Sequence, residues 1–452
     1  MPAPQKTLSN GSRRRAVLAT SAVVALTLTS GCTPKAAPDE QGPYGAPILT
    51  STPSGLRARQ TMDMLNSDWS IEPANVKFLA DPKVVDDIAY RLKWIWWDRP
   101  FNVTKVDFGT NTSTLHVTNS FGAQQEIQLH VNKKGLVDKL EVTVDPPPIR
   151  SWSDIDTQIA KTGASYSYQA SKIVDGKCLM VHGTNTEVPM PMASIFKLYV
   201  LLAVAHAISA GTLHWTDTVT ITDDGKQLGS AKWGETPSGT TVSIRDAAQE
   251  MISASDNMAT DMLINKVGPA AVDAALVAAG HHDPASLTPF PTMHQIFSIG
   301  WGLPDLRQQW LAAAKPERDK LLKSTNSREY QPDPQRTRFA ASSIGAEWYG
   351  TAQDICRVHV ALQAAATGVA APVRDILSKV AGIDLDRLEW PYIAAKAGNL
   401  PGDLGFSWYA VDHTGQPWVV SVQSNWKEAH GQTSAQWLLN IIKPAFNLLP
   451  VR

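Results

Sequence analysis

Three consecutive prolines, Pro146-Pro147-Pro148, constrain the fold of this 452-residue chain more than any other feature. Proline has no backbone N–H and its ring clashes with the preceding helical turn, so this run cannot lie inside a helix or a central strand. It therefore predicts a boundary between two domains, residues 55–148 and residues 149–452. Two or three domains are also what a chain of this length is expected to form.

Charge and cysteine content exclude several classes of function. Charged residues make up 18% of the chain and the formal net charge is −1, so no basic surface for nucleic acid is expected. The three cysteines form no Cys-x-x-Cys pair, and the histidines lack metal-ligand spacing. We expect neither a metal nor another cofactor, and we expect the side chains of the adjacent His281 and His282 to point apart.

The first 32 residues have the pattern of an export signal. Arg13, Arg14 and Arg15 precede an apolar run from Ala16 to Leu28, which is too short to span a bilayer but fits a secretory signal. Thr29-Ser30-Gly31-Cys32 resembles a bacterial lipobox, which implies a lipid on Cys32 and attachment to the outer leaflet of the cytoplasmic membrane. Plain secretion, a retained anchor and twin-arginine export remain alternatives. Residues 33–54, rich in small residues and proline, predict a flexible tether.

Residues 55–148 predict a small α+β domain. Apolar residues have helical spacing in 55–66 and 83–97, and strand-like alternation follows, with a turn at Asn132-Lys133-Lys134-Gly135. This order resembles the cone-shaped fold of steroid isomerases and NTF2-like proteins. No motif in this half discloses a chemistry. The alternating positions are Val103, Leu115, Val117, Ile127, Leu129, Val131, Leu140, Val142 and Val144.

Residues 149–452 predict an α/β domain with strands at both of its ends. Ser165–Ile173 and Cys178–His182 alternate like a hairpin, and helical patterns fill the middle. We expect the strands of both ends to share one antiparallel sheet flanked by helices. The later strands are predicted at Ile393–Lys396, Phe406–Val411 and Trp418–Gln423.

Ser194-Ile195-Phe196-Lys197 opens an apolar helical run, Leu198 to Ile208. Free N–H groups and the helix dipole at such a position stabilise an oxyanion, and a lysine three residues on lies on the same helical face. A lysine with its ordinary pKa of about 10.4 is protonated at neutral pH. Lys197 can therefore act as a base only if burial or a nearby cation lowers its pKa.

Ser-x-x-Lys occurs twice, and two further motifs distinguish the first copy. Ser424-Asn425-Trp426-Lys427 lies on a predicted strand, where serine and lysine side chains face opposite ways. The first copy is followed by Ser255-Asp256-Asn257, between two helical patterns, and by Lys396-Ala397-Gly398 at the end of a strand.

With these three motifs in this order, residues 160–450 resemble the penicillin-recognising serine enzymes, most of all class A β-lactamases. The small first domain makes the arrangement similar to two-domain actinobacterial β-lactamase-like serine hydrolase lipoproteins. The resemblance implies an acylated Ser194, a proton acceptor in Lys197 and a proton relay in Ser255. It further implies that Asn257 and Lys396 bind substrate, that Gly398 lets the strand approach the ligand, and that the backbone N–H groups of Ser194 and Asn399 form an oxyanion hole. Asp256 is expected to brace its loop.

The sequence departs from that family in two places. Ala397 lacks the usual hydroxyl of the third motif, which predicts weaker recognition of a carboxylate; a literal Lys161-Thr162-Gly163 precedes Ser194 and is interpreted as chance. Class A enzymes place a deacylating glutamate in the stretch that corresponds to Pro284–Pro304, which here contains no Asp or Glu. We expect a packed or exposed role for His294, the possible substitute base. Surface positions are expected for the nearby acids Asp305, Glu317, Glu329 and Glu347.

The leading hypothesis is an extracytoplasmic serine hydrolase that acts on β-lactams or carboxylic esters and deacylates β-lactams slowly. A D,D-peptidase-type penicillin-binding protein is the nearest rival, because the same motifs serve both. The alternative from another class is a non-catalytic, ligand-binding lipoprotein of the envelope. Pairing of Cys178 with Cys356 stays open.

Overall fold

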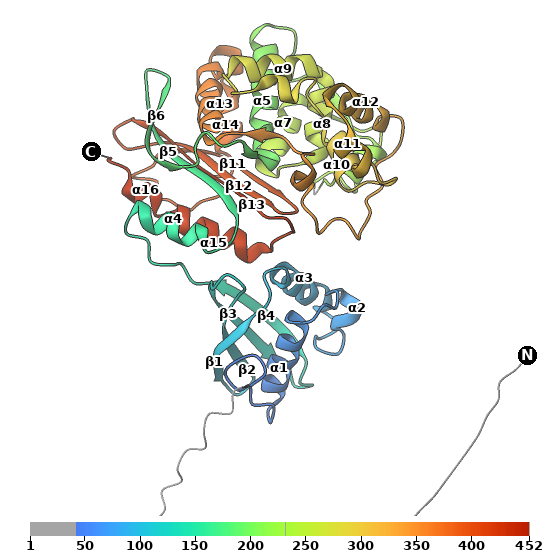
Figure 1. Ribbon diagram of the computed structural model, residues 1–452, viewed down its shortest axis with the longest axis vertical. Helices are drawn as coiled ribbons and strands as arrows, with labels where there is room; N and C mark the ends of the chain where they lie inside the picture. Colours follow the sequence, from blue (N-terminus) through green and yellow to red (C-terminus); the bar gives the residue numbers. More distant parts are fainter. Residues whose placement is uncertain (1–41, 231, 452) are drawn as a thin grey trace, which may run out of the picture. The chain divides into compact units, whose positions relative to one another are not determined.

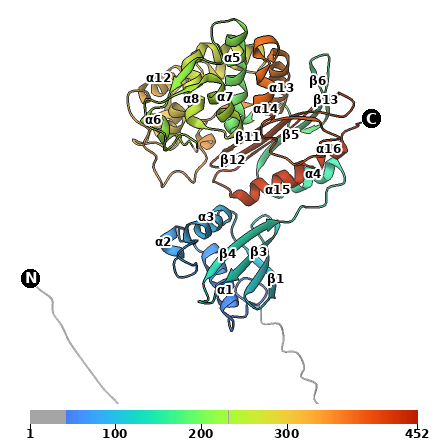
Figure 2. The same ribbon diagram turned by 180° about the vertical axis from the view of Figure 1, so that it is seen from behind.

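The computed structural model describes residues 42–230 and 232–451 (Figures 1 and 2). The predicted signal peptide, Cys32 and the first part of the tether lie outside these residues. Within the described part of the chain, every helix is too short or too polar to cross a membrane.

The first domain combines three helices with a four-stranded antiparallel sheet in the order β1-β2-β3-β4. Side chains alternate between buried and partly exposed along β2, and the buried set packs against the helices. The predicted turn joins β3 to β4, with Gly135 N donating to Asn132 O at 2.8 Å. The elements are α1 (Pro53–Leu65), α2 (Pro73–Val76), α3 (Val85–Trp96), β1 (Asn102–Phe108), β2 (Thr112–Thr118), β3 (Gln124–Val131) and β4 (Val137–Val144).

The end of the predicted tether is part of this domain. Ala46 N donates to Val103 O at 2.8 Å, and Val103 N donates to Tyr44 O at 2.6 Å, so this segment lies along β1. Helix α1 begins at Pro53, where the side chain of Thr52 accepts the N–H of Gly55. The tether predicted for residues 33–54 is therefore wrong for its last residues, because backbone pairing and a helix cap hold them.

The second domain contains the remaining elements. Up to the middle of the domain these are α4 (Trp152–Ala160), β5 (Ser165–Val174), β6 (Lys177–Thr184), β7 (Met190–Pro191), η1 (Ala193–Phe196), α5 (Lys197–Ser209), β8 (Thr218–Thr220), α6 (Asp223–Gln227), β9 (Thr241–Ser243), α7 (Ile244–Ser253), α8 (Asn257–Val267), α9 (Pro269–Ala278), η2 (Pro284–Leu287) and α10 (Met293–Gly300). They are followed by α11 (Arg307–Ala312), α12 (Lys315–Thr325), η3 (Ala341–Ile344), β10 (Tyr349–Gly350), α13 (Ala352–Ala365), η4 (Gly368–Ala370), α14 (Pro372–Ser378), β11 (Tyr392–Leu400), β12 (Asp403–Val411), β13 (Pro417–Asn425), α15 (Gln432–Ile442) and α16 (Ala445–Leu448).

Strands from both ends of the second domain share one antiparallel sheet, as predicted, in the order β11-β12-β13-β5-β6. Helices α4, α15 and α16 cover one face of this sheet, and the larger helical group that includes α5 and α13 covers the other (Figure 1). The predicted α/β body, an antiparallel sheet flanked by helices, is therefore confirmed.

Helix α5 is apolar on all sides over its first part after Lys197, and this part is buried on all sides. Every residue from Leu198 to Ala205 is buried, and the helix contacts α8, α9 and α13. A helix packed on every face has little freedom to shift, so the side chains at its N-terminus are held in place. Cys178 and Cys356, whose pairing the sequence left open, form a disulfide between β6 and α13.

Candidate active site

Ser194 lies in η1, one turn before α5, on a strained backbone. The preceding residue, Ala193, has a φ of +43°, which is rare for a residue with a side chain. Strand β11 comes very close here, because a Cβ on Gly398 would lie 2.7 Å from Met192 O and 2.8 Å from Ser194 N. Glycine was expected at this position to admit a ligand. The structure gives an additional reason, which is the contact between β11 and the backbone of Ser194.

Lys197 is completely buried at the start of α5. Its Nζ lies 2.5 Å from Ser255 O, 2.8 Å from Asn257 Oδ1 and 3.3 Å from Ser255 Oγ. Burial, and secondly the charge of Lys396, hold the pKa of Lys197 well below its usual value, against the opposing effect of Asp256 and Asp261. In its neutral form, the amine of Lys197 donates its two N–H groups to Ser255 O and Asn257 Oδ1. Its lone pair can then accept a proton from a hydroxyl.

Lys396 approaches the same serine from β11. Its Nζ donates to Ser255 Oγ at 2.9 Å and to Ala397 O at 2.5 Å. Burial lowers the pKa of Lys396 to about 7. The hydroxyl of Ser255 therefore lies between two amines that titrate below the normal range of lysine, an arrangement able to pass a proton in either direction.

The loop with Ser255, Asp256 and Asn257 is held by its own hydrogen bonds. Ser255 has a φ of +57°, and Asp256 Oδ1 caps α8 by accepting the N–H of Ala259 at 2.7 Å, which fits the bracing role expected for it. Asn257 Nδ2 donates to Leu228 O at 2.9 Å while its oxygen contacts Lys197. Asn257 thus positions Lys197, and its predicted contact with a substrate amide stays a prediction.

The end of β11 presents alternate residues to opposite sides. Lys396 and Gly398 are buried, whereas Ala397 and Asn399 are exposed. A cavity of about 190 Å³ is bounded here by Ser255, Lys396, Ala397, Phe406 and Ser407, among others. A small hollow therefore adjoins the hydroxyl of Ser255 and the amine of Lys396.

The second Ser-x-x-Lys copy lacks this setting. Ser424 lies on β13 and is 2% exposed, whereas Lys427 follows the strand and is exposed. The strand predicted for this copy is confirmed. Lys161-Thr162-Gly163 follows the end of α4, far in sequence from the β11 position of Lys396.

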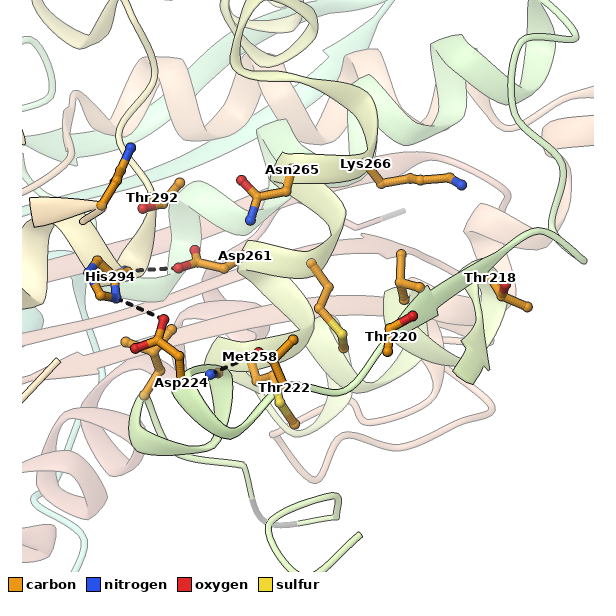
Figure 3. Close-up of a pocket in the computed structure, with 15 residues that line it drawn as sticks. Thr218, Thr220, Thr222, Asp224, Met258, Asp261, Asn265, Lys266, Thr292 and His294 are labelled. Carbon is orange, nitrogen blue, oxygen red and sulfur yellow. Dashed lines mark hydrogen bonds and ion pairs between the residues drawn. The ribbon is translucent and has the colours of Figure 1, made fainter. Parts of the chain in front are cut away.

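His294 belongs to a different pocket, of about 590 Å³, formed by α6, α8 and α10 (Figure 3). Its Nε2 lies 3.0 Å from Thr325 O and its Nδ1 lies 3.3 Å from Asp224 Oδ2. Asp261 accepts the backbone N–H of His294 at 2.9 Å and that of Met293 at 2.7 Å. Among the described residues, no residue lines both this pocket and the cavity beside Ser255. His294 is thus a packed histidine, as expected.

The surface position expected for the nearby acids is confirmed for three of them and is wrong for Glu347. Asp305, Glu317 and Glu329 are exposed. Glu347 is 4% exposed, and its carboxyl accepts the N–H of Trp348 at 2.9 Å and faces that of Ala193. Sequence reasoning also missed Asp403, which is 1% exposed and accepts Ser342 Oγ at 2.9 Å. No local signal distinguishes these acids, because the exposed Asp305 borders an apolar residue as well.

The prediction that His281 and His282 point apart is wrong. Their ring centroids are 4.7 Å apart, and Asp354 Oδ2 lies 2.5 Å from His282 Nδ1 and 3.9 Å from His281 Nε2. His281 Nδ1 accepts the N–H of Asp283 at 3.1 Å while its Nε2 faces Tyr349 O at 3.0 Å, and Arg357 contacts the carboxylate of Asp354 at 3.2 Å. The lone pair that His281 would offer a metal is already engaged, so this cluster fits a hydrogen-bond network better than an ion site.

Comparison with known proteins gives two family matches. Residues 150–366 match the model of the β-lactamase enzyme family, and residues 49–137 match that of the ORF 12 gene product N-terminal region. No curated protein matches the sequence.

Similar solved structures include three proteins. The β-lactamase from Sphaerobacter thermophilus DSM 20745 has 19% identity and a TM-score of 0.46, with 67% of this chain and 100% of that one covered. The chromosome-encoded β-lactamase of Vibrio parahaemolyticus has 13% identity and a TM-score of 0.48, with 66% and 99% covered. A PBP-A mutant in an acyl-enzyme complex with penicillin G has 16% identity and a TM-score of 0.43, with 67% and 100% covered. The region that carries Ser194, Lys197 and Ser255 thus matches the β-lactamase enzyme family, which confirms the resemblance read from the three motifs.

Proposed function

We propose that this protein is a serine hydrolase that forms an acyl-enzyme at Ser194. The observation that carries the proposal is the placement of the Ser255 hydroxyl between two buried amines, Lys197 and Lys396. Lysines in the body of a domain are ordinarily exposed and charged. Burying two of them against one hydroxyl is costly for folding and is useful for moving a proton.

In the proposed reaction, Ser194 Oγ attacks the carbonyl carbon of the substrate. Its proton passes to the lone pair of Lys197, and the negative charge on the carbonyl oxygen is stabilised by the backbone N–H groups of Ser194 and Asn399. When the bond to the leaving nitrogen or oxygen breaks, Ser255 donates a proton to that atom. Ser255 regains a proton from the ammonium group of Lys197, which returns Lys197 to its neutral form, and the acyl group remains on Ser194.

The proposed substrates are β-lactams and carboxylic esters. Protonated Lys396 supplies a positive charge for a substrate carboxylate, and Ala397 leaves that carboxylate without the second contact that a hydroxyl would give. We propose that the protein acts outside the cytoplasm as a lipoprotein anchored through Cys32. This part of the proposal rests on the sequence of the first 32 residues.

Deacylation of a β-lactam adduct is proposed to be slow. Pro284–Pro304 supplies no carboxylate, and His294 lines a separate pocket. Water near the acyl ester then lacks a positioned base. Small acyl groups leave more room for water and for Lys197 to act a second time, so simple esters should turn over better.

Two other functions use the same features differently. A D,D-peptidase would be acylated by penicillin in the same way but would release D-alanine from a peptide ending in D-alanyl-D-alanine. A non-catalytic ligand-binding lipoprotein would form no covalent adduct.

Intact-mass spectrometry of the protein after incubation with a penicillin, a cephalosporin and an activated acetyl ester tests the proposal. We expect a covalent mass increase with at least one β-lactam and hydrolysis of the ester. Release of D-alanine from the peptide would favour the peptidase. Binding without any mass change or turnover would favour the ligand-binding alternative and contradict the proposal.

A further inference from the structure

Two acidic side chains, Glu347 and Asp403, are buried near the backbone that adjoins Ser194. Glu347 precedes β10 and is 4% exposed, and Asp403 begins β12 and is 1% exposed. Asp403 accepts the hydroxyl of Ser342, and the carbonyl oxygen of the same Ser342 accepts the hydroxyl of Tyr349 at 2.9 Å, two residues after Glu347. Ser342 therefore links Asp403 to the segment that carries Glu347, and the charge of Asp403 acts on Glu347. Among the described residues, the hydrogen-bond partners of the two carboxyls are a backbone N–H, a hydroxyl and an amide rather than a lysine, arginine or histidine.

Each carboxyl has one oxygen in a hydrogen bond and one without a partner. Glu347 Oε1 accepts the N–H of Trp348, and Asp403 Oδ1 accepts Ser342 Oγ at 2.9 Å and Asn425 Nδ2 at 2.5 Å. Glu347 Oε2 and Asp403 Oδ2 are buried and have no hydrogen-bond partner among the described residues. Two ionised carboxylates buried side by side are strongly unfavourable, whereas one proton between them satisfies both free oxygens.

The pair joins the two segments that flank the carbonyl oxygen in the proposed reaction. On one side, Glu347 faces the N–H of Ala193, and Met192 N donates to Trp348 O at 2.8 Å. On the other side, Asp403 pairs with Leu400, the residue after Asn399, across the turn between β11 and β12. Ala193 is the strained residue directly before Ser194, so its conformation needs support from its surroundings.

We propose that Glu347 and Asp403 share one proton between Oε2 and Oδ2, and that this acid pair positions the backbone of Ala193–Ser194 against that of Asn399. Glu347 and Asp403 are positioning residues, because they act on the reaction through the backbone. The positioning role rests on the proposed function, whereas the shared proton does not depend on that function.

The pair predicts a pH dependence with a definite sign. Burial, and then the charge of Asp403, raise the pKa of Glu347 well above its usual value, and burial raises the pKa of Asp403. A carboxyl whose folded pKa is raised contributes stability at low pH that is lost as pH rises through the folded value. Glu347 also lines a cavity of about 360 Å³, and the other titratable and charged residues that line it are Tyr349, Arg318, Lys315, Asp319, His282 and Asp283.

Loss of the shared proton leaves two negative charges that repel each other. We expect the two segments to move apart, so that both thermal stability and the rate of Ser194 acylation fall at alkaline pH.

Infrared spectroscopy of the whole protein tests the shared proton directly. We expect a protonated-carboxyl band in the wild type at pH 7 that disappears in alkali. Glu347→Gln and Asp403→Asn should each abolish the band at pH 7, because the new amide donates to the remaining carboxylate. Asp305→Asn, at an exposed acid, is the matched control and should leave the band unchanged. A wild type without the band, or a band that survives in both variants, overturns the shared proton.

Acylation by saturating penicillin G, followed by intact mass from pH 6 to 10, tests the positioning role. Saturation removes the effect that loss of charge on Lys396 has on binding of the substrate carboxylate. Glu347→Gln should retain most of the acylation rate at pH 7 and lose the alkaline decline, whereas Glu347→Ala should acylate about 10²-fold more slowly, as for a misplaced reacting group. Glu329→Gln, at an exposed acid, should behave as the wild type does.

An alkaline decline that Glu347→Gln leaves unchanged, or full activity in Glu347→Ala, overturns the positioning role. A wild type that penicillin G does not acylate counts against both the proposed function and the positioning role. The infrared band still decides whether the proton is shared.

Discussion

The chain presents the same four-residue spacing twice, in two settings. Ser194 and Lys197 stand at the N-terminus of a helix buried on every side, and the lysine reaches Ser255 and Asn257. Ser424 lies on a central strand, and Lys427 follows the strand and is exposed. The same spacing therefore places both residues at the start of one buried helix in the first copy, and places the serine in a sheet and the lysine beyond it in the second.

The two lysines also differ in their chemistry. Burial is the largest influence on the pKa of Lys197, and the charge of Lys396 adds to it. Lys427 is exposed and has no comparable core around it. A base for serine therefore depends on the surrounding core as much as on the motif, and variants of the two copies can be compared directly.

The largest expected difference is between the two serines. Ser194→Ala should abolish formation of the acyl adduct with every substrate, because the attacking oxygen is gone. Ser424→Ala should leave labelling as in the wild type. Intact-mass spectrometry after incubation with penicillin G measures both. Equal labelling of wild type and Ser194→Ala would remove the distinction between the copies.

The next largest difference is expected between the two lysines, in their effect on the acylation rate. Lys197→Ala should slow acylation by about 10²–10⁴-fold, the loss typical of removing a positioned base. Lys427→Ala is the matched control and should change the rate little. Stopped-flow kinetics with a chromogenic cephalosporin gives both rates. A Lys197→Ala variant that acylates at the wild-type rate would mean that another group takes the proton.

Lys396→Ala tests whether the second buried amine lowers the pKa of Lys197 and binds a substrate carboxylate. Acylation requires neutral Lys197, so its rate should rise with pH through the pKa of Lys197. Removal of Lys396 removes one cause that lowers this pKa, so the rise should move to higher pH. KM for substrates with a carboxylate should increase as well. A pH–rate profile with the same acidic limb as the wild type would contradict the electrostatic coupling.

The smallest effect is expected at His294. Its ring is engaged by Thr325 and Asp224, and it lines a pocket separate from the cavity beside Ser255. His294→Ala should lower stability by about 0.5–3 kcal/mol, as is common for buried substitutions, and leave the decay of a penicillin adduct unchanged. Thermal melting and the adduct's half-life report the two effects. A half-life at least tenfold longer in the variant would identify His294 as the deacylating base.

Sequence reasoning predicted what depends on local pattern. Alternation of side chains predicted the strands, and the motifs pointed to Lys197, Ser255 and Lys396, which the structure brings together. The domain boundary at the proline run and the role of Ser194 stay predictions. Sequence reasoning did not predict what depends on contacts between distant segments. Glu347 resembled a surface acid because its neighbours Asp403 and Ala193 are remote in sequence, and residues 44–46 resembled a tether because their partner is Val103.

The predicted orientation of His281 and His282 failed for a related reason. Adjacent side chains point apart in a strand, but these two leave a helix end where both reach Asp354 on α13. A short-range rule cannot anticipate a distant carboxylate that draws both rings toward it.

A rapid-quench time course with penicillin G and an acetyl ester, read by intact mass and peptide mapping, tests the central claim most directly. We predict that one penicillin equivalent appears on the peptide with Ser194 and decays slowly, while the ester is hydrolysed over many cycles. The absence of a covalent adduct, an adduct on another peptide, or fast turnover of penicillin without accumulation would contradict the account.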